Sequence, residues 1–148
     1  MARGMGLDDS VLWLGRRSDI PQLCEAADVL AMPSDWPELF GRALIEAMAC
    51  GTPAVGANVG GIPEVLSGEF RRWVCPTRNA QAFADAFIDI HDALRADPDL
   101  SRRCREWVIQ KFYVNAAVIG VEASLRRALI LGRRRASHRV GVLAQGTN

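Results

Sequence analysis

The segment from Pro33 to Glu64 reads P-S-D-W-P-E-L-F-G-R-A-L-I-E-A-M-A-C-G-T-P-A-V-G-A-N-V-G-G-I-P-E and is the most informative part of the chain for its fold class. Its centre predicts a helix from about residue 42 to residue 50, which the Gly51-Thr52-Pro53 sequence ends. The apolar run at residues 54 to 57 then predicts a short buried strand. A helix that leads through a tight stop into an apolar strand is typical of a parallel α/β sheet.

The same alternation continues on both sides of this segment. Apolar runs at residues 11 to 14 and 29 to 32 predict two strands, and Asp19 opens a helix between them. After a short helix near Pro63, a fourth strand is expected at about residues 72 to 75. The chain therefore predicts an α/β fold with a partial doubly wound, Rossmann-like parallel sheet of about four short strands, covered by helices on both faces.

After Pro76 the pattern becomes helical. Asn79 is the expected cap of a helix that extends at least to Ile90, and two more helices are predicted over about residues 100–112 and 115–131. The Arg-rich segment from Gly132 onward resembles a mobile tail. We therefore expect one domain over residues 1–131 and a basic, flexible tail over residues 132–148.

Composition narrows the function classes. The 148 residues are 49% hydrophobic and 24% charged, with a formal net charge of +1, which argues against a general nucleic-acid binder. The four cysteines have no C-x-x-C spacing, so neither a zinc site nor a disulfide framework is predicted, and they suit a reducing compartment. With no signal sequence and no long apolar run, a cytoplasmic chain is expected.

Two carboxylates point to a ligand site. Glu38 follows the second predicted strand, and Glu46 lies eight positions later, a little over two helical turns, so both can reach one cleft. Ligands of open parallel sheets bind at the carboxyl ends of the strands. The helix that Phe40-Gly41 opens can hold phosphate at its N–H groups, and Glu46 can accept hydrogen bonds from ribose hydroxyls. Taken alone, the pair is also compatible with a loop acid and a solvated helix residue.

Six linked elements resemble the retaining glycosyltransferases of family four, which have the GT-B fold. They occur in the family's order and spacing as Leu14-Gly15, Ala27-Asp28, Pro33-Ser34, Glu38-Leu39-Phe40-Gly41, Glu46-Ala47-Met48-Ala49-Cys50-Gly51-Thr52-Pro53 and Gly60-Gly61-Ile62-Pro63-Glu64. The resemblance covers about residues 11 to 131 and falls within the family's C-terminal, nucleotide-sugar-binding domain. Its length and its six parts make it specific.

The resemblance implies a retaining hexosyltransferase that uses a nucleotide-diphosphate sugar as co-substrate and needs no metal or other cofactor. It implies that Glu38 is catalytic and faces the donor sugar, and that Glu46 binds the ribose. The remaining residues that it assigns are Ser34, Leu39, Phe40 and Gly41 for the sugar and phosphates, and Arg16 and Arg17 for the base. The implied acceptor is a glycan or a lipid, and the Arg-rich C-terminus could contact the inner face of a membrane.

Two departures from the family qualify this interpretation. The acceptor domain and the first strands of the nucleotide domain have no counterpart, so we expect a truncated donor-binding part whose sheet is interrupted and exposes apolar edges. The sequence from Ser67 to Val74 is also bulkier than the Gly-rich turn of relatives. Alternatives are a non-catalytic sugar-nucleotide-binding or interaction module and, among enzymes, a relative of sucrose synthase or of the phosphorylases.

Overall fold

The structure is a computed structural model that describes residues 3–36, 38–114, 118–119 and 121–128. The chain divides into two units, residues 1–105 and residues 106–148. The sheet and every predicted site residue belong to the first unit.

A three-stranded parallel sheet forms the centre of the first unit. Its strands are β1 (Leu30–Met32), β2 (Ala54–Ala57) and β3 (Val74–Cys75), in the spatial order β1-β2-β3. Leu30 lies opposite Ala54, and Gly56 lies opposite Val74. All four residues of β2 are buried, as expected for the central strand of a parallel sheet. The predicted strand at residues 54 to 57 is confirmed.

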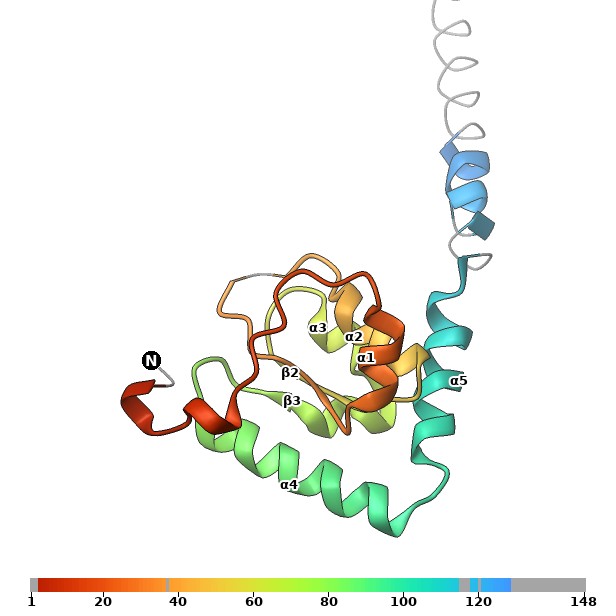
Figure 1. The fold of residues 1–148 in the computed structure, drawn as a ribbon. Coiled ribbons are helices and arrows are strands. Elements are labelled where there is room, and N and C mark those ends of the chain that lie inside the picture. Colours follow the sequence, from red (N-terminus) through yellow and green to blue (C-terminus); the bar gives the residue numbers. More distant parts are fainter. Residues whose placement is uncertain (1–2, 37, 115–117, 120, 129–148) are drawn as a thin grey trace, which may run out of the picture. The chain divides into compact units, whose positions relative to one another are not determined.

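Helices cover both faces of this sheet. In the part of the chain that holds the sheet, the described α-helices are α1 (Ile20–Ala26), α2 (Arg42–Ala49), α3 (Ile62–Val65), α4 (Ala80–Ala96) and α5 (Leu100–Phe112), and the described 3-10 helices are η1 (Arg3–Met5), η2 (Asp8–Ser10) and η3 (Gly68–Trp73). α2 packs on β1 and β2, α3 packs on β2, and α1 packs on α2. α4 contacts β2 and β3, and Figure 1 shows it on the opposite side of the sheet. The predicted α/β class is confirmed.

The core lies between the sheet and these helices. Leu44 and Met48 of α2 and Ile62 of α3 are fully buried on one side. Trp73 is 1% exposed, packs beside Phe70 at a ring-centroid distance of 5.8 Å, and donates a hydrogen bond from its indole nitrogen to an Asp89 carboxylate oxygen at 2.6 Å. Each such side chain contributes roughly 1.5–3 kcal/mol through the apolar area that it removes from water.

The strand predicted at residues 11 to 14 does not form. This run has no regular secondary structure and is exposed, with 81% of Leu12 and 83% of Trp13 accessible to solvent. A strand is stable only beside a hydrogen-bonded neighbour. If the run at residues 11 to 14 is counted as the third strand of a dinucleotide-binding sheet and β1 as the fourth, the two do not pair directly, because the usual spatial order of the strands is 3-2-1-4-5-6. Among the described residues no strand joins this run to β1, so the sheet has three strands and not four, and β1 is an edge.

The fourth predicted strand is shorter than expected. Residues 68–73 form η3, and only Val74 and Cys75 pair with β2. The reason is that Phe70 and Trp73 must both enter the core, and residues three apart share one face of a 3-10 helix. In an extended strand, residues three apart would point to opposite faces.

The helices after Pro76 follow the prediction closely. The Asn79 side chain caps α4 by accepting a hydrogen bond from the Ala82 amide at 3.0 Å. α5 spans the predicted residues 100–112. Of the last predicted helix, residues 118–119 and 121–128 are described and are helical, and its other residues lie outside the described part of the chain. The predicted tail over residues 132–148 lies entirely outside it.

Candidate functional site

Three loops follow the carboxyl ends of the three strands, and a hydrogen bond or an ion pair joins each of them to another loop or to a neighbouring strand. We call them the strand-end loops; they are residues 33–41 after β1, residues 58–61 after β2 and residues 76–79 after β3, with residue 37 not described. The Gly61 amide donates to the Glu38 carbonyl oxygen at 2.7 Å, and the Asn58 amide donates to the Cys75 carbonyl oxygen at 2.7 Å. Together with an ion pair described below, these bonds fix the backbone that carries Glu38.

The Gly60-Gly61 pair explains how the first two loops come so close. A Cβ atom on Gly60 would stand 2.8 Å from the Glu38 nitrogen and closer still to its carbonyl oxygen, and a Cβ on Gly61 would stand 2.7 Å from the Leu39 carbonyl oxygen. Gly60 also has φ of +52°, in the left-handed region that favours glycine. Only a residue without a side chain fits under the Glu38 backbone.

Gly41 turns the chain from this loop into α2. It is buried, has φ of +68°, and a Cβ there would stand 3.2 Å from a Leu44 methyl group. Among the described residues no side chain caps the start of α2. Its first N–H groups therefore lie one residue from Phe40, where the positive end of the helix dipole can act on an anion.

The two predicted acids lie in different surroundings. Glu38 is half-buried in the loop, whereas Glu46 is on the exposed side of α2 with 44% of its side chain accessible. One Glu46 carboxylate oxygen accepts two hydrogen bonds from the Arg42 guanidinium, at 2.9 Å and 3.3 Å. Because Glu46 is one turn beyond Arg42, the pair lies along the helix.

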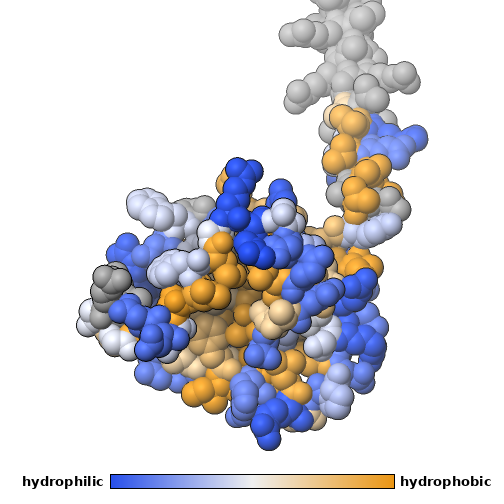
Figure 2. Space-filling model, in the orientation of Figure 1, coloured by the Kyte–Doolittle hydropathy of each residue, from blue (hydrophilic) through white to orange (hydrophobic). Residues whose placement is uncertain are grey.

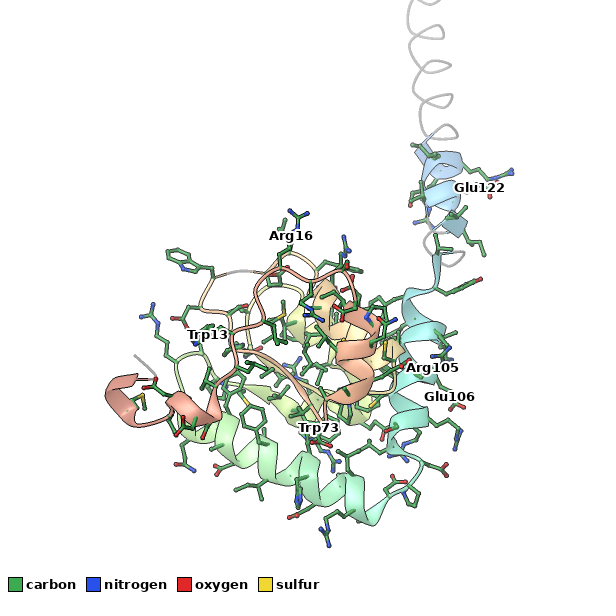
Figure 3. The ribbon with its side chains drawn as sticks, in the orientation of Figure 1. Trp13, Arg16, Trp73, Arg105, Glu106 and Glu122 are labelled. Carbon is green, nitrogen blue, oxygen red and sulfur yellow. The ribbon has the colours of Figure 1, made fainter. Side chains whose placement is uncertain are left out.

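The other predicted residues divide into two groups. Ser34 and Phe40 share the loop of Glu38, where Ser34 is half-buried and Phe40 is 51% exposed, and Leu39 beside them is 93% exposed. Arg16 and Arg17 come from the segment before α1 instead. Arg17 binds Asp19 through two hydrogen bonds, which lowers the pKa of the Asp19 carboxyl, and Figure 3 shows Arg16 directed away from the body of the unit.

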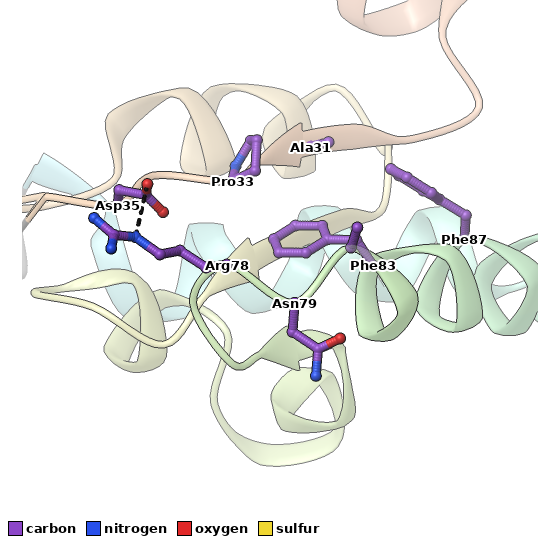
Figure 4. A pocket seen from close by; sticks show the side chains of 8 residues that line it. Ala31, Pro33, Asp35, Arg78, Asn79, Phe83 and Phe87 are labelled. Atoms are coloured by element: carbon purple, nitrogen blue, oxygen red, sulfur yellow. Dashed lines mark hydrogen bonds and ion pairs between the residues drawn. The ribbon is translucent and has the colours of Figure 1, made fainter. Parts of the chain in front are cut away.

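A pocket of about 450 Å³ lies beside the strand-end loops (Figure 4). Figure 2 shows it as a hollow in which apolar side chains are exposed. Its walls are mostly apolar because they include the carboxyl end of the edge strand β1 and one side of α4. The lining residues are Ala31, Pro33, Asp35, Arg78, Asn79, Ala80, Phe83 and Phe87. The pocket therefore borders the loop of Glu38 but is not lined by Glu38 or Glu46.

Asp35 and Arg78 at the rim of this pocket were not singled out from the sequence. The Arg78 guanidinium donates to an Asp35 carboxylate oxygen at 3.2 Å and so joins the first and third strand-end loops. Arg78 has φ of +56°, a conformation that costs a residue with a side chain about 1–2 kcal/mol. Asp35 was recognisable only by lying within the motif segment, and no local pattern marks Arg78.

Two negative findings concern the described residues. They contain no cluster of three or more His, Cys, Asp or Glu side chains that could hold a metal ion. Within the same part of the chain, no helix combines the length and the apolar character needed to cross a bilayer. The cysteines are free thiols, and burial raises the pKa of Cys104 to about 12, so this thiol is protonated at neutral pH.

Known proteins are similar in sequence to this part of the chain. Residues 1–107 match the family model described as glycosyl transferases group 1. The chain is 32% identical over 112 residues to N-acetyl-alpha-D-glucosaminyl L-malate synthase of Bacillus anthracis, covering 76% of the chain and 29% of that enzyme. It is 46% identical over 100 residues to D-inositol 3-phosphate glycosyltransferase of Mycolicibacterium vanbaalenii, covering 66% of the chain and 21% of that enzyme.

Solved structures agree with this placement. HepE of Anabaena in complex with UDP superimposes with a TM-score of 0.76 at 29% identity, over 85% of this chain and 35% of HepE. Sucrose-phosphate synthase of Thermosynechococcus elongatus superimposes with a TM-score of 0.75 at 29% identity, over 88% of this chain and 33% of that enzyme. The chain thus spans about a third or less of these proteins and has the fold of the nucleotide-sugar-binding domain of GT-B enzymes. It belongs to the group 1 glycosyl transferases.

Proposed function

We propose that this chain is the donor-binding part of a glycosyltransferase that moves a hexosyl group from a nucleotide-diphosphate sugar to an acceptor with retention of anomeric configuration. The observation that carries the proposal is the Glu38 backbone, clamped by Gly60 and Gly61 at the carboxyl ends of the strands, with Glu46 on the helix α2 that follows the same loop. This is the edge at which open parallel sheets bind their ligands. The similar protein HepE has been crystallised in complex with UDP and, in a second structure, with UDP-glucose.

In this proposal each of the two acids binds a different part of the donor. Half-buried Glu38 faces the sugar and accepts hydrogen bonds from its hydroxyls, while exposed Glu46 accepts hydrogen bonds from the ribose. The acceptor hydroxyl oxygen attacks the anomeric carbon of the sugar from the face that the phosphate leaves. As that bond forms, the bond from the anomeric carbon to the phosphate oxygen breaks, and the freed phosphate oxygen takes the hydroxyl proton. We propose no metal or other cofactor for this step. The acceptor, a glycan or lipid, and any contact with the inner face of a membrane are proposals of the same kind.

Nucleotide binding is tested on the chain itself. Calorimetric titration with UDP, GDP and ADP should give saturable binding of at least one diphosphate, and Glu46→Gln should weaken it about tenfold, the effect of losing one charge-assisted hydrogen bond of roughly 1.4 kcal/mol. Glu25→Gln, an exposed acid on α1, is the matched control and should bind like the unmodified chain. If none of the three nucleotides binds, or if Glu46→Gln binds equally well, the donor-site assignment is wrong.

Transfer is tested in an enzyme that contains this chain together with an acceptor domain. Glu38→Ala should lower kcat by at least about a hundredfold and leave nucleotide affinity nearly unchanged, because its carboxylate acts on the sugar and not on the nucleotide. The anomeric coupling constant in the NMR spectrum of the product should show the configuration of the donor. Near-normal turnover would remove Glu38 from the mechanism, and an inverted product would exclude retention.

A second candidate function is a binding or interaction module without transfer activity. The unpaired edge of β1 and the apolar pocket beside it favour this candidate, since both are surfaces on which another polypeptide could pack. It predicts nucleotide binding without transfer or donor hydrolysis. Likeness to sucrose-phosphate synthase also keeps a sucrose-synthase-like activity as an alternative among enzymes, and assays of a complete chain with fructose and fructose phosphate would separate it.

A further inference from the structure

Arg42 is placed at a helix position where a cation is not expected. It is the first residue of α2, where the helix dipole is positive and favours acidic side chains. Its partner Glu46 is four residues toward the C-terminus, the less favourable order for an ion pair along a helix. With 83% of its side chain exposed, Arg42 also contributes little to packing. Helix stability therefore does not explain why an arginine stands here.

Its surroundings in the proposed donor site do explain it. Glu38, Arg42 and Glu46 recur at intervals of four residues, so that an acid, a base and an acid follow one another from the loop along α2. A nucleotide-diphosphate sugar has the matching sequence of neutral sugar, anionic diphosphate and neutral ribose. If the sugar lies at Glu38 and the ribose at Glu46, the diphosphate passes the residue between them.

We infer that Arg42 is the diphosphate-binding side chain of this site, and that it leaves Glu46 when the donor binds. This inference rests on the proposed function. One Glu46 oxygen accepts both hydrogen bonds from the guanidinium, at 2.9 Å and 3.3 Å. The ribose hydroxyls then replace the guanidinium as donors to Glu46, and the guanidinium turns to the phosphate oxygens, whose planar pairs of acceptors it matches. Each group exchanges one partner for another, so neither is left unpaired.

A series of ligands with increasing phosphate content tests this on the chain itself. Uridine, UMP and UDP are titrated by NMR chemical-shift mapping into the unmodified chain, Arg42→Leu and Arg42→Lys. Arg42→Leu should bind UDP about 10- to 30-fold more weakly than the unmodified chain, and its loss of UMP affinity should be smaller. It should bind uridine equally well or better, because Glu46 is then free for the ribose. Arg42→Lys should keep part of the UDP affinity, since lysine retains the charge but not the two-pronged geometry. The deficit of Arg42→Leu should shrink as salt is raised.

Arg102→Leu provides the matched control. Arg102 is also an exposed helical arginine in an ion pair, with Asp99 at 3.2 Å, and should leave all three affinities unchanged. Equal UDP affinity in Arg42→Leu and the unmodified chain would overturn the inference and leave the proposed function standing. An equal loss for uridine and UDP would also overturn it, because Arg42 would then act only by orienting Glu46. Failure of the unmodified chain to bind UDP would overturn the inference and count against the proposed function as well.

Discussion

The strand-end loops and the N-terminal segment of residues 3–19 show opposite relations between sequence and structure. In the loops, the Gly61 amide donates to the Glu38 carbonyl oxygen, and Gly60 and Gly61 lie directly under the Glu38 backbone. In the N-terminal segment, the apolar run at residues 11 to 14 is as strand-like in sequence as β2, yet it is exposed. The loops take their shape because both sides of this contact, Glu38 and the Gly60-Gly61 pair, lie within the same motif segment of the chain. A strand needs a neighbour that the chain must also supply.

The largest difference should appear between two tryptophans, one from the core and one from the exposed run. Trp73→Ala should destabilise the fold by about 3–5 kcal/mol, because it empties a buried site and leaves Asp89 without its indole donor. Trp13→Ala should change stability by less than about 0.5 kcal/mol, since 83% of the side chain is already exposed. Urea unfolding followed by circular dichroism measures both. Similar losses would mean that residues 11 to 14 are packed in solution.

Two glycines with similar backbone angles give the next comparison. Gly60→Ala should cost about 3 kcal/mol, because the new methyl group meets the Glu38 backbone in addition to the strain of a positive φ. Gly15→Ala has φ of +63° but nothing within 4 Å of the new atom, so it should cost only about 1 kcal/mol. Thermal unfolding of the two variants isolates the effect of the contact. Equal destabilisation would show that the Glu38 loop can move aside.

A smaller effect is expected where α1 joins the sheet. The buried Thr52 hydroxyl donates to the Cys24 carbonyl oxygen at 2.6 Å. Thr52→Val keeps the shape but removes the donor, which should cost about 1–2 kcal/mol because the carbonyl is left unsatisfied. Thr77→Val, on the exposed loop after β3, should be close to neutral in the same denaturation experiment. A neutral Thr52→Val would mean that water or another donor reaches Cys24.

The smallest effect concerns pH. Hydrogen bonding to Arg103 lowers the pKa of the Asp97 carboxyl in the folded state. Its contribution to stability is therefore present above the unfolded pKa of about 3.9 and is lost as pH falls through the lower folded value. Asp97→Asn should make the decline of stability below about pH 4 shallower.

Asp19→Asn serves as the comparison for this pH effect. Arg17 lowers the pKa of Asp19 too, but the two residues are only two positions apart, so their attraction persists in the unfolded chain and contributes less to the difference between states. Melting temperatures measured between pH 5 and pH 2.5 would decide. A steeper acid decline in Asp97→Asn than in the unmodified chain would contradict the assignment.

The sequence predicted those features that depend on neighbouring residues. The α/β class, β2, the bounds of α5 and the Asn79 cap follow from local patterns and stops. The missing strand at residues 11 to 14 and the 3-10 turn at residues 68–73 did not, because each depends on what lies beside it in space. At the candidate site, the roles that the motif predicts for Glu38 and Glu46 stay predictions, whereas the ion pair of Asp35 with Arg78 joins residues 43 positions apart and has no local pattern.

The hydrogen bond between Gly61 and the Glu38 carbonyl has a further thermodynamic consequence. Fixing one residue of a free loop costs about 1–2 kcal/mol of conformational entropy. Because the loops after β1 and β2 hold each other, this cost is met when the chain folds and not when a ligand arrives. The backbone beneath Glu38 should therefore need no separate ordering step when a ligand binds. The association rate of that ligand should depend little on loop motion.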